Sequence, residues 1–163
     1  MSFDDLPEQP EARRLLTAAV AEGPAHAYLL HGPAGVGKRA AARMFASALL
    51  GDERRVAAGT HPDLFSLEAL GEMIRIDEVR ALHRDLHMRP YEAERRVYVI
   101  ADAHLLNEDA ADALLKDLEE RPIAYGAAEG KRVAFQPGDA ILFGSQSRFG
   151  HQAGFAQARL SAD

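Results

Sequence analysis

Apolar residues between positions 11 and 120 follow two spacings in turn. Recurrence every three or four positions predicts four helices, over residues 11–23, 39–50, 76–89 and 108–120. Short continuous apolar runs predict three buried strands, over residues 27–31, 61–69 and 97–101. Helices and strands that alternate in this way are typical of a parallel sheet wrapped by helices, so we predict an α/β fold.

Polar residues mark the ends of these elements. Asp77 is a predicted N-cap for the third helix, and Pro90 ends that helix. Asn107 is a predicted N-cap for the fourth helix, whose first turn carries the acidic residues that a helix dipole favours. Residues 51–60 (GDERRVAAGT) are predicted to form a polar connection.

The sequence changes character after Arg121, which divides the chain into a module at residues 1–121 and a diverged tail at residues 122–163. The tail contains KRVAFQ, a PGD turn and AILFG, which together predict a β-hairpin, followed by a flexible end. An incomplete sheet would expose an apolar edge. We therefore predict that the hairpin-like tail covers this edge.

Composition narrows the class of protein. The 163 residues, 47% hydrophobic and 27% charged, suffice for one domain with a sizeable core. A formal charge of −6 argues against a free-standing nucleic-acid binder, which needs a surplus of Lys and Arg. Cysteine is absent, which excludes a disulfide framework and a thiolate zinc site and suits a cytoplasmic location. No apolar run approaches the length that spans a membrane.

The segment between the first strand and the second helix fits the phosphate-loop pattern G-x-x-x-x-G-K. Backbone N–H groups of such a loop surround phosphate oxygens, the lysine adds a positive charge, and the helix start adds its partial charge. We predict that ATP binds here, with contributions from Gly32, Pro33, Ala34, Gly35, Val36, Gly37, Lys38, Arg39 and Asp102.

Two features of this site argue against hydrolysis. Arg39 stands where Ser or Thr would place a hydroxyl on Mg²⁺, and a guanidinium has no acceptor atom for a cation. Asp102 follows the third strand and could hold Mg²⁺ through water, but Ala103 follows it where a glutamate would polarise the attacking water. We therefore predict ATP binding without turnover, with no catalytic residue and no metal-ligating residue, while the presence of Mg²⁺ stays open; His104 is a substitute base only in principle.

Three segments, HAYLLHGPAGVGK, GTHPDLFSLE and RPYEAERRVYVIADAHLLNEDAADALLKDLEE, taken in this order, resemble the N-terminal AAA+ module of delta-prime clamp-loader subunits of bacterial DNA polymerase III. The resemblance covers about residues 2–120. It implies a P-loop NTPase fold of AAA+ type, incomplete here. Within the family, Gly32, Gly35, Gly37 and Lys38 match the phosphate loop, Asp102 matches the acid on the metal side, and residues 6–10 overlap the place of adenine contact.

The resemblance also implies partners and a process. Clamp loaders are pentamers that open the sliding clamp and place it on primed DNA, using ATP bound between subunits. The implied direct partners are other clamp-loader subunits, and the clamp and primed DNA are reached through the complex. The chain would then belong to the DNA polymerase holoenzyme, a nucleotidyltransferase, without ATPase activity of its own.

The chain departs from the family pattern in three places. Many relatives hold zinc with four cysteines before the HPDL segment, and residues 51–60 contain none. The sensor strand and the S-R-C motif expected after residue 120 are not recognisable; Ser147 and Arg148 stand in a different setting. We expect the lid and collar domains of the family to be missing as well. We interpret the chain as an incomplete module with a diverged or foreign tail, of the kind that truncation, frameshift or fusion produces.

Other interpretations remain open at this point. The chain could be an interaction module without a ligand. His61 and Asp63 form H-x-D, and the tail with His151 and Arg159 faintly resembles an iron and 2-oxoglutarate dioxygenase. A strand entry explains the pair better, because a complete α/β module separates it from the tail. His83 and His87 lie one helical turn apart, although a solvated helix face explains them better than a metal site.

Overall fold

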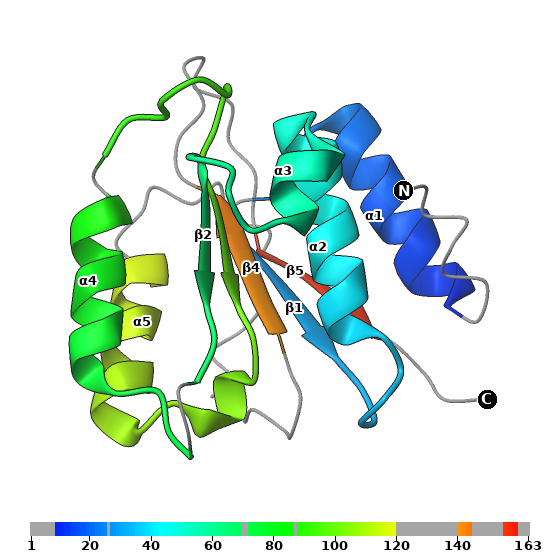
Figure 1. Cartoon of the computed structure of the whole chain (residues 1–163). Coiled ribbons are helices and arrows are strands. Elements are labelled where there is room, and N and C mark those ends of the chain that lie inside the picture. Colours follow the sequence, from blue (N-terminus) through cyan, green and yellow to red (C-terminus); the bar gives the residue numbers. More distant parts are fainter. Residues whose placement is uncertain are drawn as a thin grey trace.

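A computed structural model describes most of the chain (Figure 1). The described residues are 9–25, 27–69, 72–86, 88–119, 140–144 and 155–159.

The centre of the molecule is a five-stranded sheet with the order β2-β3-β4-β1-β5. Its strands are β1 (Ala27–His31), β2 (Leu64–Leu67), β3 (Val97–Ile100), β4 (Ala140–Gly144) and β5 (Phe155–Arg159). β2 is parallel to β3, and β5 is parallel to β1. β4 is antiparallel to both β1 and β3, so the other four strands share one direction.

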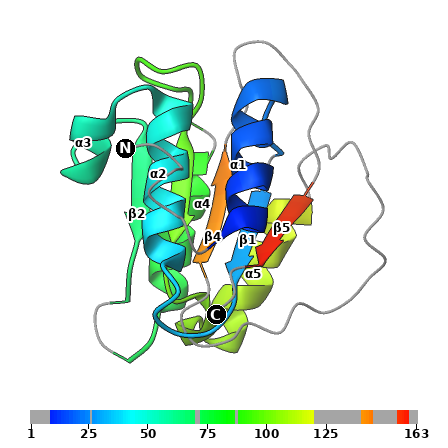
Figure 2. The same ribbon diagram turned by 90° about the vertical axis from the view of Figure 1, so that its right-hand side faces the viewer.

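Helices cover both faces of this sheet. They are α1 (Pro10–Glu22), α2 (Lys38–Leu50), α3 (Glu53–Ala57), α4 (Ile76–Leu86) and α5 (Glu108–Glu119), with a short 3₁₀ turn, η2 (Ala103–Leu105), before α5. α4 and α5 lie on one face, and α1, α2 and α3 lie on the other (Figure 1). Figure 2 shows α1 and α2 in front of the sheet and α4 and α5 behind it. Among the described residues, no helix has the length and apolar character needed to cross a membrane.

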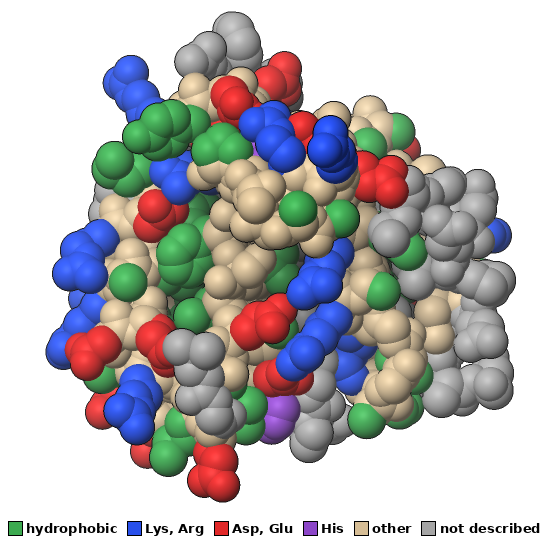
Figure 3. All heavy atoms as spheres, viewed as in Figure 1, with side chains coloured by type: hydrophobic (Ala, Val, Ile, Leu, Met, Phe, Trp, Pro, Cys, Tyr) green, Lys and Arg blue, Asp and Glu red, His purple; other side chains and the backbone are tan. Residues whose placement is uncertain are grey.

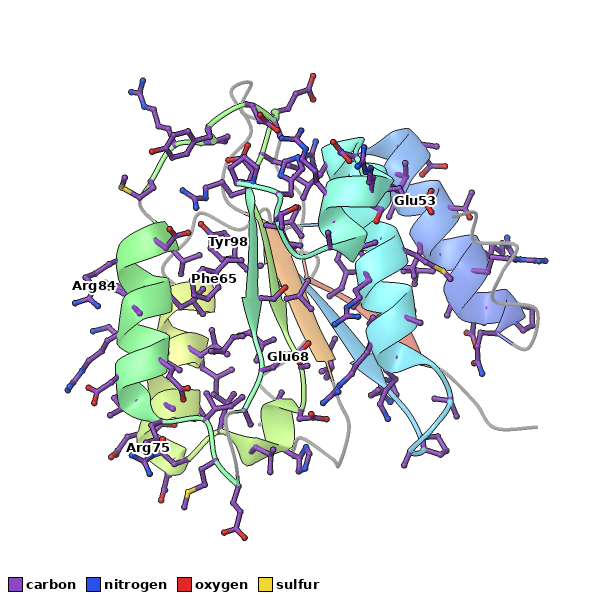
Figure 4. All side chains as sticks on the ribbon, viewed as in Figure 1. Glu53, Phe65, Glu68, Arg75, Arg84 and Tyr98 are labelled. Atoms are coloured by element: carbon purple, nitrogen blue, oxygen red, sulfur yellow. The ribbon has the colours of Figure 1, made fainter. Side chains whose placement is uncertain are left out.

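Alternation along the strands divides the core into two apolar clusters. On the face covered by α1 and α2, Tyr28 and Leu30 of β1 pack with Phe45 and with Leu16, and the Tyr28 and Phe45 rings meet edge to face at 4.8 Å. Leu29 of β1 faces the opposite way, into a second cluster. That cluster also contains Tyr98, Ile100, Ile74, Val79, Leu82 and Leu114. Figure 4 shows Phe65 and Tyr98 on this second side, toward α4.

The three predicted strands and four predicted helices of the module are present, and one of the two predicted N-caps is confirmed. Asn107 is confirmed as the N-cap of α5, since its side-chain oxygen accepts a hydrogen bond from the Ala110 amide at 3.0 Å. The prediction that Asp77 caps α4 is wrong, because the helix already begins at Ile76. Glu78 satisfies the helix start instead, accepting a hydrogen bond from the Arg75 amide at 2.7 Å.

The predicted polar connection at residues 51–60 contains the short helix α3. Asp52 caps it by accepting a hydrogen bond from the Arg55 amide at 2.9 Å, and it also pairs with the Arg55 side chain at 2.7 Å. Val56 on the same turn is buried in the first cluster. One apolar side chain and one cap were enough to form a helical turn in a polar segment.

The tail contributes two strands to the sheet. AILFG is confirmed as a strand, β4, whereas its predicted hairpin partner at residues 131–136 lies outside the described residues. β4 occupies an interior position, with β1 on one side and β3 on the other. β5 pairs with the remaining edge of β1. The predicted parallel sheet is therefore interrupted by one antiparallel strand, and the tail completes the sheet from within as well as at its edge.

Candidate functional site

The phosphate-loop pattern forms the connection between the end of β1 and the start of α2. Gly32, Gly35 and Gly37 have φ angles of 144°, 83° and 88°, a region that side-chain-bearing residues rarely adopt. Pro33 and Ala34 lie exposed at the tip of the loop, with Gly35 beside them.

The loop is joined firmly to the fold at its far end. Val36 is partly buried and packs against the first apolar cluster. Gly37 lies immediately before the first helical residue, and its carbonyl accepts the first intrahelical hydrogen bond, from the Ala41 amide at 2.9 Å. The N-cap residue of α2 is Gly37, which has no side chain. No N-cap side chain therefore accepts a hydrogen bond from the first amides of the helix.

Lys38 is buried, with 5% of its surface exposed. Its amine donates hydrogen bonds to the carbonyl oxygens of Gly32 and of Pro33, the latter at 2.8 Å. The cation therefore lies within the curve of the loop and holds it closed from inside. A phosphate group bound by the loop would meet this positive charge together with the amides of the helix start.

Asp102 lies next to the loop, as the sequence predicted for an acid at the end of a parallel strand. It follows β3 and adopts a left-handed backbone conformation with φ 53° and ψ 49°. Its carboxylate forms an ion pair with the guanidinium of Arg39 in the first turn of α2. Asp102 is 18% exposed and Arg39 is 54% exposed, so the acid is largely covered while the base faces solvent.

The residue after Asp102 faces away from the loop. Ala103 is fully buried and belongs to the second apolar cluster, on the face covered by α4 and α5. His104 is half-buried in the same 3₁₀ turn. A water-polarising carboxylate at position 103 would thus have to lie in the core of this fold.

A second ion pair lies one turn farther along α2. Arg43 meets the Glu68 carboxylate, which follows β2, at 3.2 Å. Figure 4 shows Glu68 at this end of the sheet, facing α2, and Figure 3 shows basic and acidic side chains interleaved along the same face. Arg39 and Arg43 therefore bridge one helix to the ends of two neighbouring strands.

His61 and Asp63, the H-x-D pair, fix a loop. The buried Asp63 carboxylate accepts hydrogen bonds from the amides of Tyr91, Glu92 and Ala93 at 2.6, 2.9 and 2.8 Å. The His61 ring accepts one from the Asp63 amide at 3.1 Å. Both groups are thereby engaged in holding the segment that leads into β3.

Burial alone would raise the pKa of Asp63, but the hydrogen bonds from the three amides and the charge of Arg96 outweigh it. The pKa of Asp63 therefore lies below its ordinary value, and the group carries its negative charge at neutral pH.

The remaining candidates are not brought to the loop. His83 lies on the exposed side of α4, and His87, Ser147, Arg148 and His151 lie outside the described residues. So does most of the predicted adenine contact, residues 6–8. Within the described part of the chain, no three His, Asp or Glu side chains are placed to hold a metal ion together.

The sequence analysis did not find the contact between Arg39 and Asp102. These residues are 63 positions apart, and each had been assigned to the nucleotide separately. The available signal was the coincidence of a basic residue at the hydroxyl position with an acid at the end of a neighbouring strand.

Comparison with known proteins extends this picture. The family described as "DNA polymerase III, delta subunit" matches residues 8–125. The chain is 42% identical over 111 residues to DNA polymerase III subunit delta' of Pseudomonas aeruginosa, covering 59% of this chain and 34% of that protein. It is 31% identical over 125 residues to DNA polymerase III subunit delta' of Bacillus subtilis, covering 69% of this chain and 38% of that protein. The chain thus spans about a third of these curated relatives.

A solved structure shares the fold. A DNA polymerase III gamma subunit-related protein from Thermotoga maritima superposes with a TM-score of 0.56, covering 94% of this chain and 46% of that one. The sequence identity is 15%, so this likeness concerns the fold alone.

Proposed function

Because the chain belongs to the DNA polymerase III delta subunit family, we propose that it acts in DNA replication as a clamp-loader-type subunit that binds ATP without hydrolysing it. Its direct partners would be other clamp-loader subunits in the cytoplasm. The sliding clamp and primed DNA would be reached through that complex, which fits the net charge of −6 on this chain.

The observation that carries ATP binding is the geometry of the loop at residues 32–37. Its three glycines adopt the positive φ angles described above, it leads directly into α2, and Lys38 lies buried beneath it. Amides at a helix start, a glycine turn and a lysine together suit the oxygens of a polyphosphate.

Position 103 supports the proposed absence of turnover. In this fold the residue after Asp102 is buried among apolar side chains, and alanine there cannot polarise water. A bound ATP would act as a structural ligand between subunits, and hydrolysis would fall to other members of the complex.

ATP binding can be measured by isothermal titration calorimetry on the full chain. We expect wild type to bind ATP and Lys38→Ala to bind at least about tenfold more weakly, because the amine is lost from beneath the phosphates. Lys116→Ala, which removes an exposed lysine from α5, is the matched control and should bind as wild type. Equal binding by wild type and Lys38→Ala, or none by wild type, would contradict the proposal.

Assembly is a separate measurement. Size-exclusion chromatography of the chain mixed with the other clamp-loader subunits should show co-elution. A specific observation favours the alternative of an interaction module: two of the three N–H donors of the Lys38 amine already meet carbonyl oxygens of its own loop. Co-elution without any ATP binding would support that alternative.

A further inference from the structure

The ion pair between Arg39 and Asp102 indicates which cation neutralises the phosphates at this site. This inference rests on the proposed ATP binding. We propose that the Arg39 guanidinium, held by Asp102, takes the place of a divalent cation, so that the site binds its nucleoside triphosphate without Mg²⁺.

The protein groups that would hold Mg²⁺ do not fit the ion. Mg²⁺ takes oxygen ligands in near-octahedral geometry. At a phosphate loop the protein oxygens come from a hydroxyl after the lysine and from an acid at the end of a neighbouring strand. Here the first position is Arg39, which offers only N–H donors, and the second is Asp102, whose carboxylate is engaged by that same arginine.

The pair occupies a fixed place in the fold. Arg39 lies in the first turn of α2, directly after Lys38, and Asp102 lies two residues after Ile100, the end of β3. Among the described non-glycine residues, Asp102 is the one with a positive φ, a conformation that aspartate tolerates better than most residues. With 18% of its side chain exposed, the acid has little surface left for a second partner.

Arg39 keeps donors for a phosphate group. A guanidinium carries five N–H donors, and one terminal nitrogen, Nη2, meets Asp102. More than half of the side chain is exposed, on the helix turn that begins at the loop. Its planar donors suit phosphate oxygens, so one side chain can join Asp102 to the bound ligand as a bridging metal ion would.

The matched control is Arg43, which lies one turn farther along α2 and pairs with Glu68 at 3.2 Å. It has the same side chain, the same helix and a comparable exposure of 59%. It pairs with Glu68 and not with Asp102. Removing it therefore changes the charge of the helix but leaves the ion pair of Asp102 intact.

The experiment measures the dissociation constant of ATP by calorimetry, once in excess Mg²⁺ and once in EDTA, for wild type, Arg39→Ser, Arg39→Lys and Arg43→Ser. Circular dichroism of each variant verifies that it is folded. We expect wild type, Arg39→Lys and Arg43→Ser to bind in EDTA at least as tightly as in Mg²⁺. Arg39→Ser, which frees Asp102 and supplies a hydroxyl, should bind about tenfold more tightly in Mg²⁺ than in EDTA.

The outcomes separate this inference from the proposed function. Wild type that binds ATP about tenfold more tightly in Mg²⁺ would overturn the inference and leave ATP binding intact. Wild type that binds in neither condition would overturn ATP binding. The inference would then fall together with ATP binding, since wild type would hold no nucleotide without Mg²⁺.

Discussion

Replacing Asp63 by alanine tests whether one buried carboxylate holds the loop that leads into β3. Three consecutive amides, those of Tyr91, Glu92 and Ala93, donate to its two oxygens over 2.6 to 2.9 Å. The carboxylate is fully buried, whereas Tyr91 is 76% exposed, so polar contacts rather than burial of the Tyr91 side chain hold this end of the segment.

The expected loss follows from these contacts. Hydrogen bonds to a charged group contribute about 1.5–3 kcal/mol each. Tyr91 and Glu92 are exposed residues, so water can reach their amides in the variant and recover part of the loss. We therefore expect Asp63→Ala to lower the free energy of unfolding by about 3–4 kcal/mol, a value that lies in the range of broken buried networks.

The assay is urea unfolding followed by circular dichroism, with Asp77→Ala as the control. Asp77 is also an aspartate in an ion pair, with Arg80 at 3.3 Å, but its side chain is 84% exposed. Removing it should change stability by no more than about 0.5 kcal/mol. Amide hydrogen exchange at residues 91–93 should become faster in Asp63→Ala alone. Stability of Asp63→Ala within about 0.5 kcal/mol of wild type would refute the reasoning.

The same carboxylate predicts a pH dependence. Because the pKa of Asp63 is lower in the folded chain than in the unfolded one, its stabilisation is fully present above the unfolded value, about 3.9. It is lost as the pH falls through the lower, folded value. The stability difference between wild type and Asp63→Ala should therefore be constant above about pH 5 and shrink below about pH 4.

Two further substitutions address α5 and the 3₁₀ turn before it. Asn107→Ala removes the cap that binds the Ala110 amide and should lower the free energy of unfolding by about 1 kcal/mol, while Asn107→Ser should retain most of it; equal losses would show that the cap is not responsible. Ala103→Glu buries a carboxylate in the second apolar cluster and should destabilise by about 3 kcal/mol or more without phosphate release from ATP; hydrolysis with unchanged stability would contradict the placement of this residue.

The sequence predicted those parts of the fold that depend on interactions between residues close together in the chain. The apolar runs of β1 and β3 are buried on both faces, so their composition alone marks them as strands. The glycine loop was found because only glycine adopts its φ angles readily, and Asn107 because a side-chain oxygen at a helix start satisfies a free amide.

The features that sequence missed depend on contacts between distant segments. The run AILFG is equally apolar in either direction, so its pattern predicted a strand but not its antiparallel orientation or its interior position. Arg39 and Asp102 were each recognised, but their pairing depends on the neighbouring ends of α2 and β3. The sequence did not reveal what Asp63 binds, because its three partners are backbone amides, which leave no trace in side-chain identity.

The position of β4 determines the order in which this domain can fold. β1 and β3 do not pair with each other; each pairs with β4, in a register that joins Ala27 to Phe143 and Val97 to Gly144. During synthesis the pairs for β1 therefore emerge long after β1 itself, whereas β2 and β3 can pair much earlier. Sheets with such distant pairings fold slowly, because a long loop must close before the contacts stabilise it. During synthesis, β1 and the phosphate loop that follows it cannot be joined to β3 through β4 until residues 140–144 have left the ribosome.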